Sequence, residues 1–294
     1  MKKQIDHIRR IGLLGNAQKA ACAGIVRTAV RLIRKAGLEY FCNPETARLA
    51  GLKGTPCPDA ATLAQEVDLL LVFGGDGTIL RVARDIAGSP TPVLGVNIGG
   101  LGFLTAVPSK ELAQALKRVW RGEYTLQSRA LIEVGGALRG QKVLQRALND
   151  VVVSRGAVSR LISLDVGVDG EPITRYRCDG LIISSPTGST AYSLAAGGAI
   201  VLPTAEVFTL TPICPHSLSN RSIILPLSSQ ITVKAVTPLL STILSADGQM
   251  VAEMDAGDEV TIRRSHRAIR LVQLADGSFL EALRRKLHWR GTYL

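Results

Sequence analysis

Residues 74–78, Gly-Gly-Asp-Gly-Thr, are well suited to chemistry, because one carboxylate stands among three glycines directly after an apolar run. Glycines permit positive φ and let backbone amides approach a ligand closely. A helix that begins here adds N–H groups without helical partners and a positive dipole potential, a combination that suits phosphate. Arg81 lies about one turn into that helix, and its side chain leans back toward the same anion.

Asp76 admits three interpretations. A carboxylate is a poor phosphate ligand, but it is suited to accept a proton from a hydroxyl that attacks phosphorus. It is also suited to hold the diol of a ribose, or to cap its own backbone in a tight strand–helix turn. The segment is not a Walker A loop, because Gly-Lys occurs nowhere in the chain, and no G-x-G-x-x-G fingerprint is present.

A second run, DGLIISSPTGSTAYSLAAGG (179–198), again places a turn after an apolar strand pattern. Hydroxyls crowd this turn at Thr187, Ser189, Thr190 and Ser193. The small residues that follow leave room for a planar ring, hydroxyls bind phosphates or sugars, and Tyr192 is suited to stack on a base or a nicotinamide. Two such loops after buried strands favour a nucleotide site over ordinary turns.

Two further segments add polar groups at strand ends. NIGGLGFLT (97–105) has glycines that allow close backbone approach, while Phe103 and Leu104 are suited to wall a ring. In LNDVVVSRG, Asn149 and Asp150 open an apolar strand, and a carboxamide beside a carboxylate suits the two hydroxyls of a ribose. Taken alone, 97–105 is equally explained as a structural turn, and the Asn149–Asp150 pair is more often a turn than a site.

The elements that position these groups alternate in the first part of the chain. Apolar runs predict strands at 11–16, 38–42, 68–73 and 92–97. Helical spacing of apolar residues predicts helices at 25–36, 78–86 and 109–122, with a short one before residue 68. Alternating strands and helices favour a parallel sheet with both faces covered.

From Tyr124 onward the pattern changes to short β-type runs separated by turn residues. These runs are 131–138, 141–155, 161–170, 178–185, 230–236 and 258–264. We therefore expect an α/β domain at 1–123, a β-rich domain at 124–275, and a helix at 276–294 that packs back on the first domain.

Composition excludes several classes of protein. No apolar run approaches the roughly 18 residues of a membrane helix, and charged residues interrupt any signal-peptide core near the start, so we expect a cytoplasmic protein without a membrane partner. The net charge of +11 is concentrated in residues 1–35 and 261–294, without interleaved aromatics, so nucleic-acid binding is not expected. Five widely spaced cysteines predict buried free thiols rather than a disulfide framework or a zinc site.

These stretches, in this order, resemble the bacterial NAD kinases, and the resemblance extends from RIGLLGN to the KLHW region. The run CDGLIISSPTGSTAYSLAAGG is far more specific than Gly-Gly-Asp-Gly-Thr, which is also found in diacylglycerol and sphingosine kinases. PHSLSNRSIILP (215–226) and ADGQ (246–249) also look like that family. The resemblance implies an NAD kinase-like fold, with 124–275 as the NAD-binding domain.

The resemblance further implies phosphorylation of NAD at the 2′-hydroxyl of the adenosine ribose, with Asp76 as the general base. Asn149 and Asp150 then grip the adenosine ribose or nearby groups. The remaining contacts to the dinucleotide fall on Gly77, Arg81, Arg160, Arg177, Asp179, Thr190, Ala191, Tyr192, Ser193, Leu194, Ala195 and Gln249. Mg²⁺ is expected to arrive with ATP, since no dedicated metal cage is visible, and relatives assemble as homodimers or homotetramers.

Two positions distinguish this chain within the resemblance. The acid after Asn149 is Asp, where Glu is frequent, so the carboxylate stands on a shorter arm. Arg177 is at the second position. In relatives, a charged residue there goes with a preference for NAD over NADH, and a glycine there goes with acceptance of both. The choice between ATP and polyphosphate as donor, and allosteric control by NADPH or NADH, stay open.

Two other functions share some of these features. A lipid kinase of the Gly-Gly-Asp-Gly-Thr type uses the same donor chemistry, but the Thr-Gly-Ser-Thr-Ala-Tyr segment and the lack of an amphipathic membrane stripe disfavour it. A non-catalytic dinucleotide sensor is disfavoured by Asp76, because a protein that only binds does not need a base at the phosphate loop.

Overall fold

A computed structural model describes residues 8–53, 57–86, 88–100, 102–158, 160–217, 221–238, 242–274 and 278–289. The chain divides into two compact units: unit 1 contains Met1–Ser128 and Ile269–Leu294, and unit 2 contains Arg129–Ala268. The sequence placed the boundaries after residues 123 and 275. The observed divisions fall inside long strands, where no change of composition marks them.

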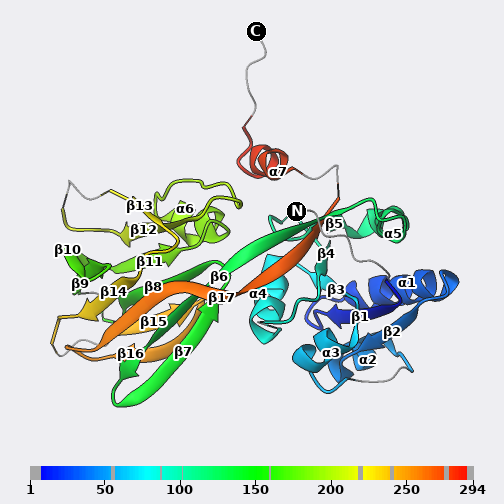
Figure 1. Cartoon of the computed structure of the whole chain (residues 1–294), viewed down its shortest axis with the longest axis horizontal. Helices are drawn as coiled ribbons and strands as arrows, with labels where there is room; N and C mark the ends of the chain where they lie inside the picture. Colours follow the sequence, from blue (N-terminus) through cyan, green and yellow to red (C-terminus); the bar gives the residue numbers. More distant parts are fainter. Residues whose placement is uncertain are drawn as a thin grey trace, which may run out of the picture. The chain divides into compact units, whose positions relative to one another are not determined.

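In unit 1, strands alternate with helices along the chain (Figure 1). The elements are β1 (Arg10–Gly15), α1 (Cys22–Lys35), β2 (Glu39–Cys42), α2 (Pro44–Ala50), α3 (Ala60–Glu66), β3 (Leu69–Gly74), α4 (Asp76–Asp85), β4 (Val93–Asn97), β5 (Val107–Pro108), the 3₁₀ turn η1 (Ser109–Glu111), α5 (Leu112–Trp120) and α7 (Phe279–Lys286). Strands β4, β3, β1 and β2 lie side by side in that order and are all parallel, which confirms the expected α/β fold.

Strand periodicity explains how both faces of this sheet are covered. Ile11 and Leu13 of β1 belong to one apolar core with residues of α1 and α5. Gly12 faces the other way, where a Cβ would lie 2.5 Å from Leu70 and 3.2 Å from Leu63 of α3. Successive side chains of a strand point to opposite faces, so helices are needed on both.

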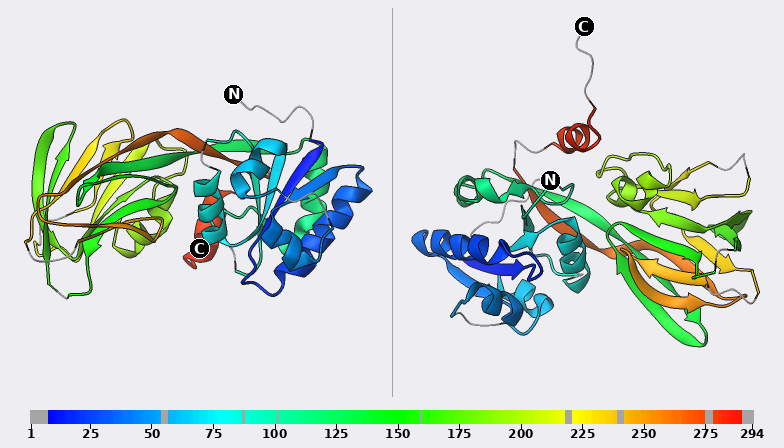
Figure 2. Two further views of the ribbon diagram at one scale, coloured as in Figure 1. Left: turned by 90° about the horizontal axis from the view of Figure 1, so that it is seen from below. Right: turned by 180° about the vertical axis from the view of Figure 1, so that it is seen from behind.

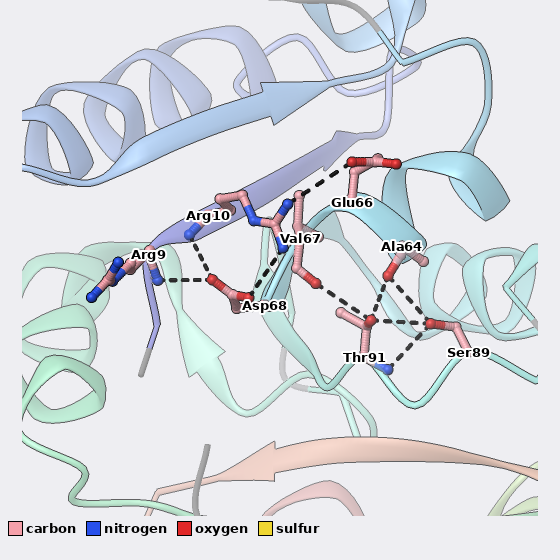
Figure 3. Close-up of polar contacts among 8 residues, drawn as sticks. All are labelled: Arg9, Arg10, Ala64, Glu66, Val67, Asp68, Ser89 and Thr91. Atoms are coloured by element: carbon pink, nitrogen blue, oxygen red, sulfur yellow. Dashed lines mark hydrogen bonds and ion pairs between the residues drawn. The ribbon is translucent and has the colours of Figure 1, made fainter. Parts of the chain in front are cut away.

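The amino ends of β1 and β3 are held together by one carboxylate (Figure 3). Asp68 accepts hydrogen bonds from the backbone N–H groups of Arg9, at 2.9 Å, and Arg10, at 2.8 Å. The guanidinium of Arg10 also lies 3.8 Å from Asp68 and 3.9 Å from Glu66. These contacts help to fix the pairing register of β1 with β3.

Unit 2 is built mostly of strands, as expected. Its elements are β6 (Thr125–Leu138, which begins in unit 1), β7 (Gln141–Ala147), β8 (Asp150–Arg155), β9 (Ile162–Val168), β10 (Glu171–Cys178), β11 (Gly180–Ser184), the 3₁₀ turn η2 (Gly188–Thr190), α6 (Tyr192–Ala195), β12 (Val207–Ile213), β13 (Ile223–Pro226), β14 (Ile231–Ala235), β15 (Thr242–Ala246), β16 (Gln249–Met254) and β17 (Glu259–Gln273, which ends in unit 1).

Two sheets share the core of unit 2. One runs in the order β13-β12-β11-β8-β15-β16 with antiparallel pairing throughout, and the other contains β10, β9, β14 and β17. Phe208 and Leu181 of the first sheet and Leu164 and Ile262 of the second belong to the same buried cluster. The sheets thus bury one face each against a common apolar layer.

The five cysteines are free thiols, and four of them are buried. Cys214 is exposed, so the expectation of burial was wrong there. It follows the end of β12 in a left-handed conformation, with φ of 44°, which places it in a turn rather than in a strand. Among the described residues, no helix combines the length and apolarity needed to span a bilayer.

Candidate functional site

The carboxyl ends of β1, β3 and β4 are level with one another. Gly15 pairs with Phe73, and Gly74 pairs with Asn97. The loops that leave these three strands therefore emerge at one edge of the sheet, and they contain Gly-Gly-Asp-Gly-Thr and the glycine-rich run 97–105. The sequence predicted both loops separately, and the structure brings them together.

The strand order also reverses at this edge. From β1 the chain enters α1 on one face of the sheet, whereas from β3 it enters α4 on the other (Figure 2). In open α/β sheets, ligands bind where neighbouring strands send their connections to opposite faces. The edge between β1 and β3 is such a switch point.

The carboxylate of Asp76 is held by the backbone of the neighbouring loop. Its Oδ2 accepts a hydrogen bond from the N–H of Phe103 at 2.8 Å, and its Oδ1 accepts one from Leu104 at 3.0 Å. An ionised carboxylate offers about four acceptor positions, so two bonds orient it and leave lone pairs on both oxygens. The structural alternative, in which Asp76 caps its own helix, is not what the described contacts show.

Small residues make this arrangement possible. A Cβ on Gly102 would lie 2.1 Å from Oδ1 of Asp76, and one on Gly74 would lie 2.1 Å from Oγ1 of Thr78. Asn97 donates from its side chain to the carbonyl of Gly100 at 2.6 Å and to Thr105 at 3.0 Å. The glycines here permit close approach of side chain to backbone, and the amide of Asn97 secures the fold of the loop.

The helix α7 contacts the same loop from within unit 1. The rings of Phe279 and Phe103 lie 5.9 Å apart, centroid to centroid. The Nζ of Lys286 lies 4.5 Å from the Phe103 ring centroid and 3.9 Å from Oδ2 of Asp76. A cation thus stands beside the carboxylate and over an aromatic face, an arrangement favoured by both interactions.

In unit 2, the second polar pair is ordered by a residue that the sequence analysis did not select. Asp247 accepts hydrogen bonds from the N–H groups of Leu148 at 2.9 Å and Asn149 at 2.7 Å. Its own N–H donates to the carbonyl of Asp150 at 3.0 Å. Asp247 and Gly248 both have positive φ and connect β15 to β16, as expected for an Asp-Gly hairpin turn.

Asp150 is the buried member of that pair, with 5% of its surface exposed. Burial raises the pKa of its carboxyl from the ordinary value of 3.8 to about 7, and the negative charge of Asp247 adds to the shift. Near neutral pH, Asp150 is therefore present in both protonation states. Its protonated form donates a hydrogen bond, which an ionised carboxylate cannot do.

In the serine- and threonine-rich turn, several hydroxyl groups form hydrogen bonds with other groups of the protein. Ser189 and Ser193 are fully buried. Ser189 donates to the carbonyl of Pro186 at 2.8 Å, and Ser193 lies 3.0 Å from the hydroxyl of Thr211. By contrast, Tyr192 is 48% exposed.

The other residues selected from the sequence lie on strands and turns of unit 2 or on α4 of unit 1. Asp179 pairs with Arg155, whose Nε lies 2.8 Å from Oδ1. The exposed ones are Gly77 and Arg81 of α4 and Arg160, Arg177, Ala195 and Gln249 of unit 2, while Asn149, Thr190, Ala191 and Leu194 are partly buried. Their roles toward a ligand stay predictions.

Comparison with known proteins identifies the family. Residues 58–124 match the ATP-NAD kinase N-terminal domain, and residues 148–274 match the ATP-NAD kinase C-terminal domain. The NAD kinase of Geobacter sulfurreducens is 39% identical over 284 residues, which cover 96% of this chain and 99% of the relative. The NAD kinase of Syntrophotalea carbinolica is 38% identical over 283 residues, with the same coverage. The chain belongs to the NAD kinase family.

Solved structures of NAD kinases agree with this assignment. A yeast NADH kinase complexed with NADH has a TM-score of 0.88 and 27% identity, over 98% of this chain and 89% of that one. An NAD kinase from Archaeoglobus fulgidus in complex with ATP has a TM-score of 0.75 and 25% identity, over 96% and 100%. The expected family, fold class and enzyme class, an ATP-dependent NAD kinase, are confirmed.

Substitution of Gly102 tests the contact between loop and carboxylate. We expect Gly102→Ala to lower kcat of this NAD kinase by at least about tenfold, because its Cβ would overlap Oδ1 of Asp76 and displace the carboxylate. Gly100→Ala is the matched control, since a Cβ there meets nothing within 4 Å. Equal kcat values for the two variants, both folded by circular dichroism, would contradict this account of Asp76.

Asp150 gives the stability of the fold a predictable pH dependence. Its folded-state pKa lies above the unfolded value, so its contribution is present at low pH and is lost as pH rises from about 4 to about 7. Asp150→Asn removes this loss. We expect urea denaturation to show that the stability of the variant relative to the wild type increases between about pH 4 and about pH 7. Above about pH 7 the difference in unfolding free energy should stay constant.

Asp165 provides a control of opposite sign. Its hydrogen bond to Arg175, 2.8 Å from Nη2, lowers the pKa of its carboxyl. Asp165→Asn should therefore lose stability relative to the wild type as pH rises above the acid range, by a small amount because both side chains are exposed. If the difference in unfolding free energy between Asp150→Asn and the wild type did not change between pH 4 and 7, the raised pKa of Asp150 would be refuted.

Proposed function

We propose that this NAD kinase transfers the γ-phosphoryl group of ATP to the 2′-hydroxyl of the adenosine ribose of NAD, with Asp76 as the general base. The observation that carries the proposal is the carboxylate of Asp76, oriented by two backbone amides at the mouth of the Gly-Gly-Asp-Gly-Thr loop. The proton passes from the 2′-hydroxyl to this carboxylate. The bond from the ribose oxygen to phosphorus forms as the β–γ bridge of ATP breaks, and ADP leaves.

The loops around Asp76 are suited to hold the phosphoryl group. The N–H groups of Asp76 and Gly77 belong to the first turn of α4, where no helical carbonyl precedes them. The absence of side chains at Gly74 and Gly75 lets an anion approach these amides, and the helix dipole favours its charge. Because the amides are fixed by the fold, they need little reorganisation when charge shifts during the transfer.

Charge near the base is balanced by Lys286. Its ammonium lies 3.9 Å from Oδ2, and it is held there over the ring of Phe103. In this position its positive charge lowers the repulsion between the Asp76 carboxylate and an incoming phosphate. We assign it a supporting role and not proton transfer.

In unit 2, we propose that Asn149 and Asp150 bind the adenosine ribose of NAD. Asp247 fixes the backbone of this pair by hydrogen bonds at 2.7 Å to Asn149 and 3.3 Å to Asp150. The raised pKa of Asp150 lets it either donate to or accept from a hydroxyl near neutral pH. The family resemblance supports further contacts at the positions named from the sequence, including the turn 190–195.

Mg²⁺ fits this site as a companion of the triphosphate. The described residues contain no group of three or more His, Cys, Asp or Glu side chains arranged for a metal ion. Magnesium is commonly bound by substrate phosphates with one or two carboxylates, and Asp76 retains acceptor positions for such a contact. When bound, the ion neutralises charge on the phosphates. Assembly as a homodimer or homotetramer in the cytoplasm remains an expectation from the resemblance.

The test of this function is a coupled assay with NAD, Mg-ATP and an NADP-dependent dehydrogenase. We expect NADP formation by the wild type, and a loss of about 10²–10⁴-fold in turnover for Asp76→Asn, the range typical of a general base. NAD binding by the variant, measured calorimetrically, should be retained. Asp85→Asn, at the other end of α4, is the matched control; unchanged turnover in Asp76→Asn would remove Asp76 as the base.

Acceptor preference gives a second test of the site. Arg177 is exposed on β10, and a charged residue there is expected to favour NAD over NADH. The yeast relative solved with NADH indicates that this fold accommodates the reduced cofactor. We expect the wild type to have a higher kcat/KM for NAD than for NADH, and Arg177→Gly to reduce that ratio by at least about tenfold, or about 1.4 kcal/mol. Comparable wild-type values for NAD and NADH would refute this preference.

A further inference from the structure

One lysine lies beside both glycine loops. The Nζ of Lys19, in the turn between β1 and α1, donates a hydrogen bond to the carbonyl of Ile98, just after β4. A Cβ on Gly75 would lie 3.6 Å from this Nζ, and a Cβ on Gly99 would lie 3.5 Å from it. The ammonium therefore lies within van der Waals contact distance of the Cβ positions of two different glycine loops.

The turn that carries Lys19 is anchored to the phosphate loop. The N–H of Asn16 donates to the carbonyl of Phe73 at 2.9 Å, and its side-chain amide donates to Thr78 at 3.2 Å. Lys19 closes the turn through its own N–H, which donates to the carbonyl of Asn16 at 3.1 Å. The position of the lysine is therefore coupled to that of the glycines on β3, although they are far apart in sequence.

The position is also where the sheet topology places a ligand. Lys19 follows β1 and Gly75 follows β3, and these two strands send their connections to opposite faces of the sheet. An ammonium group has three donors, of which one is used by Ile98. In the described part of the chain, two donors and a positive charge are thus placed beside the backbone amides of this edge.

We propose that Lys19 binds a phosphate of the donor nucleotide, in the crevice between the ends of β1 and β3. The inference rests on the proposed function in taking ATP as the donor. A lysine suits this position better than an arginine, because a compact ammonium fits beside glycine backbone and contacts phosphate as a point charge. The competing explanation is that Lys19 only ties the β1 turn to the β4 loop through Ile98.

The test uses the full chain with Lys19→Met, Lys19→Arg and the control Lys35→Met, an exposed lysine in the last turn of α1. For Lys19→Met we expect KM for ATP to rise by about ten- to hundredfold, the range for loss of one hydrogen bond to a charged group. KM for NAD should change by less than about twofold, Lys19→Arg should recover part of the loss, and Lys35→Met should match the wild type.

Tripolyphosphate and adenosine separate the phosphate contact from contacts to the rest of ATP. Both compounds are measured as competitive inhibitors against ATP. The affinity of tripolyphosphate should fall in Lys19→Met by the same factor as that of ATP, whereas the affinity of adenosine should be the same in all variants. Equal tripolyphosphate affinity in wild type and Lys19→Met would overturn the proposal. Parallel loss of NAD and ATP affinity with a lowered melting temperature would also overturn it, because it would show a structural tether.

Failure of the proposed function would be seen separately. A wild type that forms no NADP in the coupled assay would refute the function of the site. Calorimetric titration of the same proteins with tripolyphosphate would still test Lys19, because that measurement requires no turnover.

Discussion

The pairing register of β1, β3 and β4 is the constraint on which the site in unit 1 depends. The carboxylate of Asp76 is held by the N–H groups of Phe103 and Leu104, and those amides follow a different strand, so the proposed role of Asp76 requires both strands in register. A slip of one residue between β3 and β4 would move the second loop by about 3.3 Å and would turn every side chain of the strand to the other face. The level ends of these strands thus convert two glycine-rich loops into one site, and the contacts of Asp68 at the opposite edge help to fix that register.

Unit 2 uses the same physical device for a different purpose. Asp247, like Asp76, has a carboxylate that accepts hydrogen bonds from backbone N–H groups of a neighbouring loop. Its bonds order the start of β8 and set Asp150 beside it in a buried position. Desolvation by burial, and to a lesser extent repulsion from Asp247, raise the pKa of Asp150. One carboxylate therefore organises backbone so that another can adopt either protonation state. The destabilisation that comes with a buried acid is consistent with a binding role, because stability alone would favour an apolar residue there.

The sequence predicts most of the elements, but less of the contacts within the site. Most strands and helices of unit 1 follow from apolar periodicity. The two-residue strand β5 was not assigned, and α2 was missed although its signals are strong: Asn43 caps it, Pro44 opens it and Gly51 ends it in the left-handed region. In unit 2, β10, β12, β13, β15 and β16 were not assigned, since short strands with mixed burial lack a clear period. Asp76 and the Asn149–Asp150 pair were identifiable because glycine or a neighbouring carboxamide marks them.

Three other residues of the sites were not identifiable from the sequence: Lys19, Asp247 and Lys286. Their significance comes from groups about 56, 100 and 210 residues away, which the fold brings near.

The glycines of the phosphate loop explain why the nearby positive charges come from other elements. A loop that admits phosphate to its backbone must lack side chains, so it cannot carry its own cation beyond the dipole of α4. Any cation must then come from elements that end near the loop, and the structure supplies Lys19 from the β1 turn and Lys286 from α7. The two lysines have different neighbours: Lys19 has carbonyl and glycine backbone beside it, whereas Lys286 has the carboxylate of Asp76 and the ring of Phe103. A cation among neutral amides is available to an anionic ligand, while a cation beside a carboxylate is partly neutralised already. We therefore expect binding of the donor phosphates to depend more on Lys19 than on Lys286.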